Sequence, residues 1–120
     1  MSREKTVLVV EDEPIIRGLV SLVLESEGYI VQSAPDGREA LDSIQCARPD
    51  AVVIDLDLPI MDGFELVRAC RAEDGTRYLP IIVVSAIYRG ERVEALDAHA
   101  FLSKPFDVER LVAQLHDVLR

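Results

Sequence analysis

The sequence predicts an α/β fold built on a parallel sheet, because short apolar runs alternate with amphipathic segments five times along the chain. Three of the runs, 6–11, 51–55 and 80–85, are nearly continuous Val, Ile and Leu, which is typical of strands covered on both faces. The chain has 120 residues, of which 49% are hydrophobic, so it fits a single domain, 1–120, with one core.

The other two predicted strands are weaker and suit the edges of the sheet. The segment around 29–32 mixes polar and apolar residues, and the run Ala100-Phe101-Leu102 is short.

The first intervening helix is predicted over 14–27, where Pro14 occupies a first-turn position and Gly28 ends the pattern. Its apolar residues should form one stripe that faces the core. That stripe comprises Ile15, Ile16, Leu19, Val20, Val23 and Leu24.

Three further segments have clear helical signals. One begins at Asp36, with Glu39 three residues later as a capping box, and ends before Pro49. Another covers 63–73, and the last, 107–119, has a regular helical period of apolar residues. The 63–73 helix is expected to bury Phe64, Val67 and Cys70.

Composition excludes several classes of protein. The net charge of -9 argues against direct nucleic-acid binding, which needs clustered Lys and Arg. No apolar run is long enough to insert in a membrane, and the start lacks a secretion signal, so a cytoplasmic location is expected. Cys46 and Cys70 share no metal or redox spacing and are expected to be reduced core thiols. The last helix reaches Arg120 with no linker behind it, and Met1 looks like a natural start, so a stand-alone domain is expected, while a domain cut from a larger protein stays open as an alternative.

Residues suited to phosphate chemistry follow four of the predicted strands. Glu11-Asp12 follows the first, Asp55 and Ser85 end the third and fourth, and Lys104 comes just after the fifth. Because parallel strands open at their carboxyl ends onto one crevice, these side chains should meet there. Three carboxylates, a hydroxyl and an ammonium group make up a metal-dependent phosphoryl-transfer site.

Four motifs in order carry a family resemblance. They are Val9-Val10-Glu11-Asp12-Glu13-Pro14, Ile54-Asp55-Leu56-Asp57-Leu58-Pro59-Ile60-Met61-Asp62-Gly63, Val84-Ser85-Ala86 and Lys104-Pro105-Phe106. With them the chain resembles a bacterial two-component response-regulator receiver domain of the stand-alone chemotaxis type, over essentially its whole length. The resemblance implies a flavodoxin-like (βα)5 three-layer sandwich with a five-stranded parallel sheet in the order 2-1-3-4-5.

The resemblance makes Asp55 the acceptor of phosphate from a sensor histidine kinase or a histidine phosphotransfer domain. It implies that Asp12 and Asp55 bind Mg²⁺ (or Mn²⁺) directly, with Glu11 acting mainly through water and the Asp57 backbone carbonyl completing the shell. Carboxylates about 5 Å apart repel by roughly 3 kcal/mol per pair at an effective dielectric near 20, and a hard divalent cation offsets this. Such a protein signals, and catalyses only its own phosphorylation and dephosphorylation.

Lys104 should pair with Asp55 and later with a phosphate oxygen, ahead of a cis bond to Pro105. Ser85 should donate a hydrogen bond to the phosphoryl group, while Phe101 turns inward and alters the face offered to an unknown protein effector. Plainer interpretations stay open: Asp55 as a turn residue, Asp12 as a helix N-cap, Glu11 as a solvated surface residue, and Phe101 as a static core aromatic.

The chain also departs from the family pattern. The interval from Ser85 to Lys104 is about three residues shorter than usual, almost one helical turn. We therefore expect a fourth helix, starting near Tyr88-Arg89-Gly90, that is short, shifted or mobile, which favours a phosphate shuttle over an allosteric switch. Asp57 adds negative charge at the mouth of the site.

Two rival families share parts of the pattern. A haloacid-dehalogenase-like phosphatase also has an Asp-x-Asp pair, here Asp55 and Asp57, but its last acidic pair follows the lysine. A flavodoxin needs a phosphate-cradling loop after the first strand, where Glu11-Asp12-Glu13 would repel phosphate. His99 and His116 have no second ligand at useful spacing and are expected at the surface.

Overall fold

The computed structural model describes residues 4–86, 96–105 and 107–119. In these residues five parallel strands form one sheet in the order β2-β1-β3-β4-β5. The fold class and strand order are confirmed, with β2 and β5 at the edges. The strands are β1 (Thr6–Val10), β2 (Ile30–Ala34), β3 (Ala51–Asp55), β4 (Ile81–Ser85) and β5 (Ala100–Ser103).

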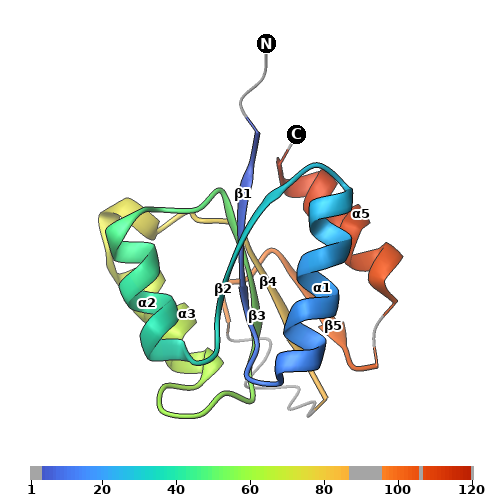
Figure 1. Cartoon of the computed structure of the whole chain (residues 1–120). Helices are drawn as coiled ribbons and strands as arrows, with labels where there is room; N and C mark the ends of the chain where they lie inside the picture. The colour runs from blue at the N-terminus through green and yellow to red at the C-terminus, as the bar shows by residue number, and fades with distance from the viewer. Residues whose placement is uncertain (1–3, 87–95, 106, 120) are drawn as a thin grey trace.

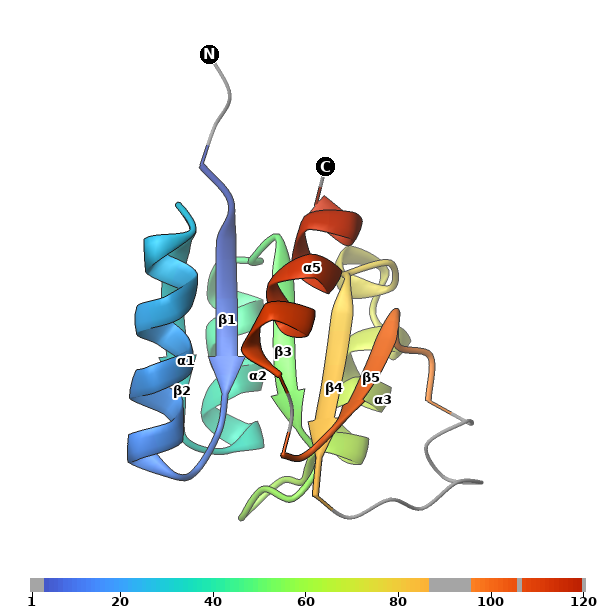
Figure 2. The same ribbon diagram turned by 90° about the vertical axis from the view of Figure 1, so that its right-hand side faces the viewer.

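Helices cover both faces of the sheet. Figure 1 shows α1 and α5 on one face and α2 and α3 on the other, which makes three layers. The helices are α1 (Pro14–Ser26), α2 (Gly37–Cys46), α3 (Gly63–Ala72) and α5 (Val108–Leu119), with a 3₁₀ turn η1 (Asp74–Thr76) after α3. In Figure 2 the arrowheads of β1, β3 and β4 point to the same edge, where the loops that follow them gather.

Successive side chains of a strand point to opposite faces of the sheet, so each strand contributes residues to two separate apolar cores. Leu8 and Val10 of β1 pack into the cluster that includes the buried residues of α2 and α3. Val7 and Val9 pack into the other, with the buried residues of α1 and α5. Because both faces are covered, β3 and β4 are buried at every position, as their continuous apolar sequence predicts.

Helix α1 buries less of its apolar stripe than predicted. Val20 and Leu24 are buried, but Ile15 and Leu19 are 78% and 55% exposed, so the prediction was wrong for these two. The helix packs on the sheet along one narrow face, whereas the stripe spans a wider arc. Gly28 ends the helix with a φ of 98°, a conformation that favours glycine.

The predicted capping box of α2 is only half formed. The Asp36 side chain accepts a hydrogen bond from the Glu39 backbone at 2.8 Å, but Glu39 returns none to the Asp36 backbone. The complete box lies at α3, where Asp62 and Glu65 bond each other's backbone N–H. In the sequence Asp62 belongs to the second family motif, and its capping role was not predicted.

Both cysteines are free, as expected. Cys70 is buried within α3, but Cys46 is exposed, so its assignment to the core was wrong. Cys46 is the last residue of α2, on the side of the helix that the sheet does not cover.

The predicted fourth helix around Tyr88-Arg89-Gly90 lies outside the described residues, so its length and position stay a prediction. The described segment before β5, 96–99, is irregular and is tied to the start of β4. His99 donates its backbone N–H to Ile81 O at 2.8 Å, and its Nδ1 accepts from Ile81 N at 3.3 Å. Within the described ranges, no helix has both the length and the apolar character needed to cross a membrane.

Candidate functional site

Three carboxylates converge where β1 and β3 end. One oxygen from each of Glu11, Asp12 and Asp55 lies within 4.8 Å of the others. Glu11 and Asp55 are only 4% and 3% exposed, whereas Asp12 is exposed. Glu11 prolongs the ladder of β1 by donating its backbone N–H to Ala34 O at 3.1 Å. The predicted convergence of these side chains is therefore confirmed, and the solvent-exposed alternative for Glu11 is wrong.

Lys104 joins the two buried carboxylates. Its Nζ donates to Asp55 Oδ2 at 2.7 Å and to Glu11 Oε1 at 2.9 Å. Its backbone N–H donates to Ser85 O at 2.9 Å, which fixes the residue against the end of β4. The pairing with Asp55 was predicted, as was the cis peptide bond to Pro105; the second contact, to Glu11, was not.

Backbone donors hold the remaining oxygens of the same two carboxylates. Asp57 N donates to Asp55 Oδ1 at 2.9 Å, and Glu13 N donates to Glu11 Oε2 at 3.2 Å. Each of the four oxygens thus accepts a hydrogen bond, which satisfies the rule that buried charges must be paired. Asp12 differs, because its carboxylate has no hydrogen bond or ion pair to any part of the chain that the structure describes.

Burial shapes the protonation of the pair. Desolvation by burial raises the pKa of Glu11, and the nearby Asp55 charge raises it further, against the lowering effect of the bonds from Lys104 and Glu13. For Lys104, burial alone would lower the pKa, but the hydrogen bonds to Asp55 and Glu11 outweigh it and raise the pKa overall. Lys104 therefore stays a cation at neutral pH.

Close packing at Gly63 fixes the backbone of Asp55. A Cβ placed on Gly63 would lie 2.6 Å from both Asp55 O and Leu56 Cα. Gly63 N also donates to Leu56 O at 3.1 Å. Only glycine lets the start of α3 lie this near the end of β3, so the Asp-Gly step beyond the strand helps to position the site.

Ser85 and Phe101 lie on the neighbouring strands. Ser85 is 2% exposed and stands opposite Ser103, whereas Phe101 stands opposite Val83 and is half-buried against the α2–α3 core. Ser85 is thus at the carboxyl end of β4, whereas Phe101 is two positions before the residue that pairs with Ser85, so the two predicted switch residues are not direct partners across the sheet. Asp57 is exposed, in agreement with a place at the mouth.

The donor set fits a hard divalent cation. Carboxylate oxygens are the ligands that Mg²⁺ and Mn²⁺ prefer. Among the three carboxylates, that of Asp12 forms no hydrogen bond or ion pair with a described residue, so it is available to a metal. None of the four Cys and His residues belongs to the cluster, so nothing in its ligand set favours a softer metal. Glu13, not Asp12, is the N-cap of α1, which leaves Asp12 without the plain capping role.

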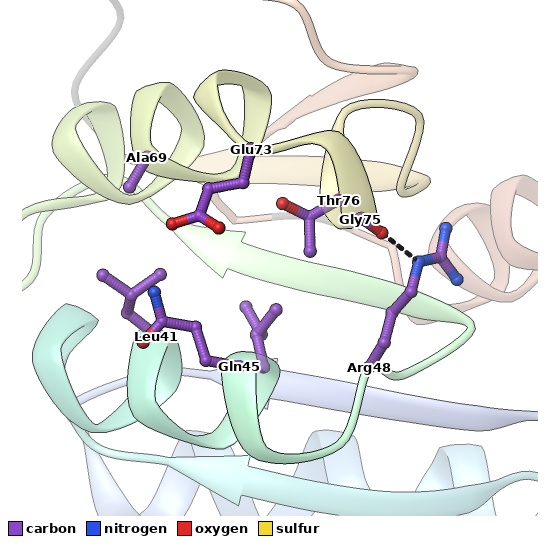
Figure 3. A pocket seen from close by; sticks show the side chains of 8 residues that line it. Leu41, Gln45, Arg48, Ala69, Glu73, Gly75 and Thr76 are labelled. Atoms are coloured by element: carbon purple, nitrogen blue, oxygen red, sulfur yellow. Dashed lines mark hydrogen bonds between the residues drawn. The ribbon is translucent and has the colours of Figure 1, made fainter.

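A separate pocket of about 420 Å³ lies far from these residues (Figure 3). It lies between the C-terminal halves of α2 and α3, near the ends of the strands opposite to the carboxylates, and Arg48 Nε closes one side by donating to Gly75 O at 3.0 Å. The pocket has no part in the chemistry argued above. Its lining residues are Leu41, Ile44, Gln45, Arg48, Ala69, Glu73, Gly75 and Thr76.

One residue at the site was missed from the sequence. The Nη1 of Arg17, on α1, donates hydrogen bonds to Glu11 O at 2.8 Å and to Asp12 O at 3.5 Å. An arginine one turn inside a helix looks like an ordinary surface residue. The available signal was its spacing from Glu11-Asp12, which allows the side chain to reach back over the first turn.

Comparison with known proteins decides the family. The sequence model of one protein family, the response regulator receiver domain, matches residues 7–116. This chain belongs to that family. Receiver domains take part in two-component signalling as phosphoacceptors and interact with histidine kinases.

Curated relatives include the response regulator MprA of Mycolicibacterium vanbaalenii, 44% identical over 95% of this chain. Another is the DNA-binding dual master transcriptional regulator RpaA of Synechocystis, 35% identical over 95% of this chain. The receiver domain covers 50% of the former and 48% of the latter. It thus spans about half the length of the curated relatives it matches.

Solved structures give the same family. The chemotaxis response regulator CheY4 of Vibrio cholerae has a TM-score of 0.90 and 38% identity, with 98% of this chain and 100% of that one covered. The receiver domain of sensor histidine kinase PA1611 from Pseudomonas aeruginosa has a TM-score of 0.89 and 32% identity, with 98% of each chain covered. That structure has a magnesium ion coordinated in its active-site cleft. Neither the phosphatase nor the flavodoxin alternative finds support.

Proposed function

We propose that Asp55 is the phosphoacceptor of this receiver domain. One Asp55 oxygen attacks the phosphorus of a phosphohistidine on a sensor histidine kinase or histidine phosphotransfer domain. The P–N bond breaks, its electron pair stays on the histidine nitrogen, and an aspartyl phosphate forms. The observation that carries the proposal is the Asp55 carboxylate itself, 3% exposed and held by Lys104 beside two more carboxylates.

The metal is proposed to be Mg²⁺ (or Mn²⁺), held by Asp12 and Asp55 directly, by Glu11 mainly through water, and by the Asp57 backbone carbonyl. When bound, such an ion offsets the repulsion among the carboxylates and neutralises charge on the transferring oxygens. The residues of the chain do the positioning. Glu11 and Asp55 are fixed by Lys104 and by backbone N–H groups, so their oxygens need little reorganisation on binding.

Lys104 and Ser85 complete the proposed chemistry. Once an Asp55 oxygen is bonded to phosphorus, that carboxylate loses its charge, and the Lys104 ammonium turns to a phosphoryl oxygen. Ser85 is buried at the end of β4, and its hydroxyl donates a hydrogen bond to a second phosphoryl oxygen. These steps limit catalysis to the protein's own phosphorylation and dephosphorylation.

Phe101 is the proposed reporter of phosphorylation. It is half-buried and borders a pocket of about 360 Å³ on the β5–α5 side, together with Pro105 and Arg110. When Ser85 shifts towards the phosphoryl group, Phe101 turns inward and changes the surface that a protein effector meets.

The phosphodonor is proposed to dock beside the site, on α1. Ile15, Leu19 and Leu22 are 78%, 55% and 64% exposed, and their spacing places them along one side of the helix. Ile15 is three positions after Asp12, so this apolar strip begins at the acidic cluster. Exposed apolar residues that line up in this way mark a protein contact.

The scope of the proposal is the domain alone. With a net charge of -9, the domain itself is not expected to bind nucleic acid, although the relative RpaA is named as DNA-binding. A cytoplasmic location follows from a kinase partner that uses intracellular phosphohistidine. The role of phosphate shuttle, which the short interval from Ser85 to Lys104 favours over an allosteric switch, stays a prediction.

Intact-mass spectrometry tests the assignment. The protein is incubated with a small-molecule phosphodonor and Mg²⁺, and one phosphoryl group should be gained. Asp55→Asn should abolish the gain, while Asp57→Asn, at the exposed carboxylate two residues away, should retain it. Phosphorylation of the Asp55→Asn variant would contradict the proposal. So would a native chain that turns over the phosphodonor without forming a stable adduct.

A further inference from the structure

Arg17 contacts the backbone of both residues in the acidic pair on the β1–α1 loop. Its Nη1 lies 2.8 Å from Glu11 O and 3.5 Å from Asp12 O. The backbone of Arg17 also forms the first hydrogen bond of α1, in which Arg17 N donates to Glu13 O at 2.9 Å. Arg17 therefore fixes the loop through its main chain and its side chain together.

This matters most for Asp12. The carboxylates of Glu11 and Asp55 are held directly, by Lys104 and by backbone N–H groups. No hydrogen bond or ion pair within the described ranges holds the Asp12 carboxylate, and that side chain is exposed. Its place within 4.8 Å of the other two oxygens is then set by its backbone, whose carbonyl Arg17 contacts.

We propose that Arg17 is a positioning residue for the metal site: its guanidinium holds the Glu11–Asp12 backbone so that the Asp12 carboxylate faces the other two. The inference rests on the proposed function, because it assumes that Mg²⁺ binds this cluster. Arg17 itself is no ligand, since a guanidinium has only donors.

Charge and geometry predict opposite effects when Arg17 is removed. A cation beside a cation site repels the incoming metal, so loss of the charge alone should tighten Mg²⁺ binding. Loss of the hydrogen bonds to Glu11 O and Asp12 O releases Asp12 and should weaken it. Partners that orient metal ligands typically change metal affinity by about 10- to 100-fold when they are mutated. The sign of the change therefore separates a positioning role from an electrostatic or an incidental one.

The test is calorimetric titration of the full chain with MgCl₂ at low temperature, where all variants are folded. Arg17→Met should weaken binding about tenfold. Arg17→Gln, which is neutral but keeps amide donors, should bind more tightly than Arg17→Met, and so should Arg17→Lys. Arg38→Met removes an exposed cation of α2, whose Nε lies 3.9 Å from Asp42 Oδ1, and it should leave Mg²⁺ affinity unchanged.

Amide chemical shifts of residues 11–13, recorded without Mg²⁺, give a second readout that does not depend on binding. They should move in Arg17→Met and stay in place in Arg38→Met. Unchanged or tighter Mg²⁺ binding by Arg17→Met would overturn the inference, as would unmoved amide shifts. If the native chain failed to bind Mg²⁺ at all, the metal assignment under the proposed function would fail first, and the amide shifts would still report whether Arg17 orders the loop.

Discussion

The Lys104 ammonium lies 2.7 Å from Asp55 Oδ2 and bridges it to Glu11, whose Oε1 is 2.9 Å away. The bridge joins the ends of β1, β3 and β5 through side chains that are 18% (Lys104), 6% (Glu11) and 4% (Asp55) exposed. Lys104 thus has a structural effect before any phosphate arrives. It allows two carboxylates to stay ionised in the interior of one edge of the sheet.

Lys104→Met should lower the free energy of unfolding by about 3 kcal/mol, because breaking a buried ion pair leaves its partners unpaired. Urea denaturation at pH 7 without Mg²⁺ measures the loss. Arg110→Met, which removes an exposed cation on α5, serves as the control and should cost little. A loss for Lys104→Met of under about 1 kcal/mol, the size expected of a surface pair, would contradict the burial argument.

Glu11 should reduce stability at neutral pH in the absence of metal. Burial raises its pKa above the ordinary 4.5, so the folded state holds this proton more tightly than the unfolded state does. The stability linked to this group is then present below pH 4.5 and lost as the pH rises through the raised folded pKa. Glu11→Gln can still accept from Lys104, although its single amide oxygen cannot also accept from Glu13 N, and it should remove this pH-dependent loss from the metal-free protein.

Thermal melts from pH 4 to pH 8 check the Glu11 prediction. Relative to the native chain, Glu11→Gln should become more stable as the pH rises, and millimolar Mg²⁺ should stabilise the variant less than the native chain. Glu25→Gln, at an exposed position of α1, should show neither effect. A Glu11→Gln variant whose stability relative to the native chain stays constant or falls as the pH rises would refute the sign.

The meeting of Glu11, Asp55 and Lys104 could be predicted from sequence for a simple reason. Each follows an apolar strand, and parallel strands share one carboxyl edge. Periodicity also gave the fold class and the two edge strands, while the full strand order came from the family resemblance. The two arginines that organise the loops, Arg17 and Arg71, were not found in this way, because their partners are backbone carbonyls, which no particular residue type reveals; for Arg17 the spacing from Glu11-Asp12 was the one signal.

Burial was harder to predict than secondary structure. A helical period tells which side of α1 is apolar, but the area covered depends on how closely the sheet and α5 approach it. Ile15 and Leu19 were therefore placed in the core wrongly, and Cys46 likewise at the end of α2. At α1 the error is informative, because an apolar strip that the fold does not cover remains for a partner.

Leu19→Glu should slow phosphotransfer from a histidine phosphotransfer protein or kinase about tenfold, since it would bury an unpaired carboxylate in an apolar contact and about 1.4 kcal/mol corresponds to a factor of ten. Phosphorylation by a small-molecule donor should stay unchanged, because Leu19 is outside the acidic cluster. Tyr78→Glu, at an 81% exposed apolar residue just before β4, is the matched control and should leave both reactions intact. Equal slowing with both donors would mean that the substitution damages the site rather than the docking surface.

The two thiols should differ sharply in reactivity. Burial raises the pKa of Cys70, whereas Cys46 is exposed, so iodoacetamide at pH 8 should alkylate only Cys46 in the folded protein. Peptide mass spectrometry locates the adduct, and Cys46→Ser should leave the folded chain unlabelled. In urea both thiols should react. Labelling of Cys70 without denaturant would show that α3 opens far more readily than its packing implies.

Among the described cations outside the carboxylate site, Arg71 should be the most costly to remove. Its Nη1 donates to three carbonyls in the α3–β4 connection, and its Nε donates to Asp97 O at 2.8 Å, just before β5. One half-buried side chain thus joins three parts of the chain. The acceptors are the carbonyls of Thr76, Arg77, Leu79 and Asp97.

Arg71→Met should therefore lower the free energy of unfolding by about 2 kcal/mol, since partly buried carbonyls lose a charged donor. Arg71→Lys should recover only a part, because an ammonium cannot reproduce the fork of a guanidinium. Arg68→Met, on the exposed side of the same helix, should change stability by less than about 0.5 kcal/mol. If Arg68→Met and Arg71→Met gave equal losses in urea denaturation, the effect would come from helix propensity, and the carbonyl contacts of Arg71 would contribute nothing of their own.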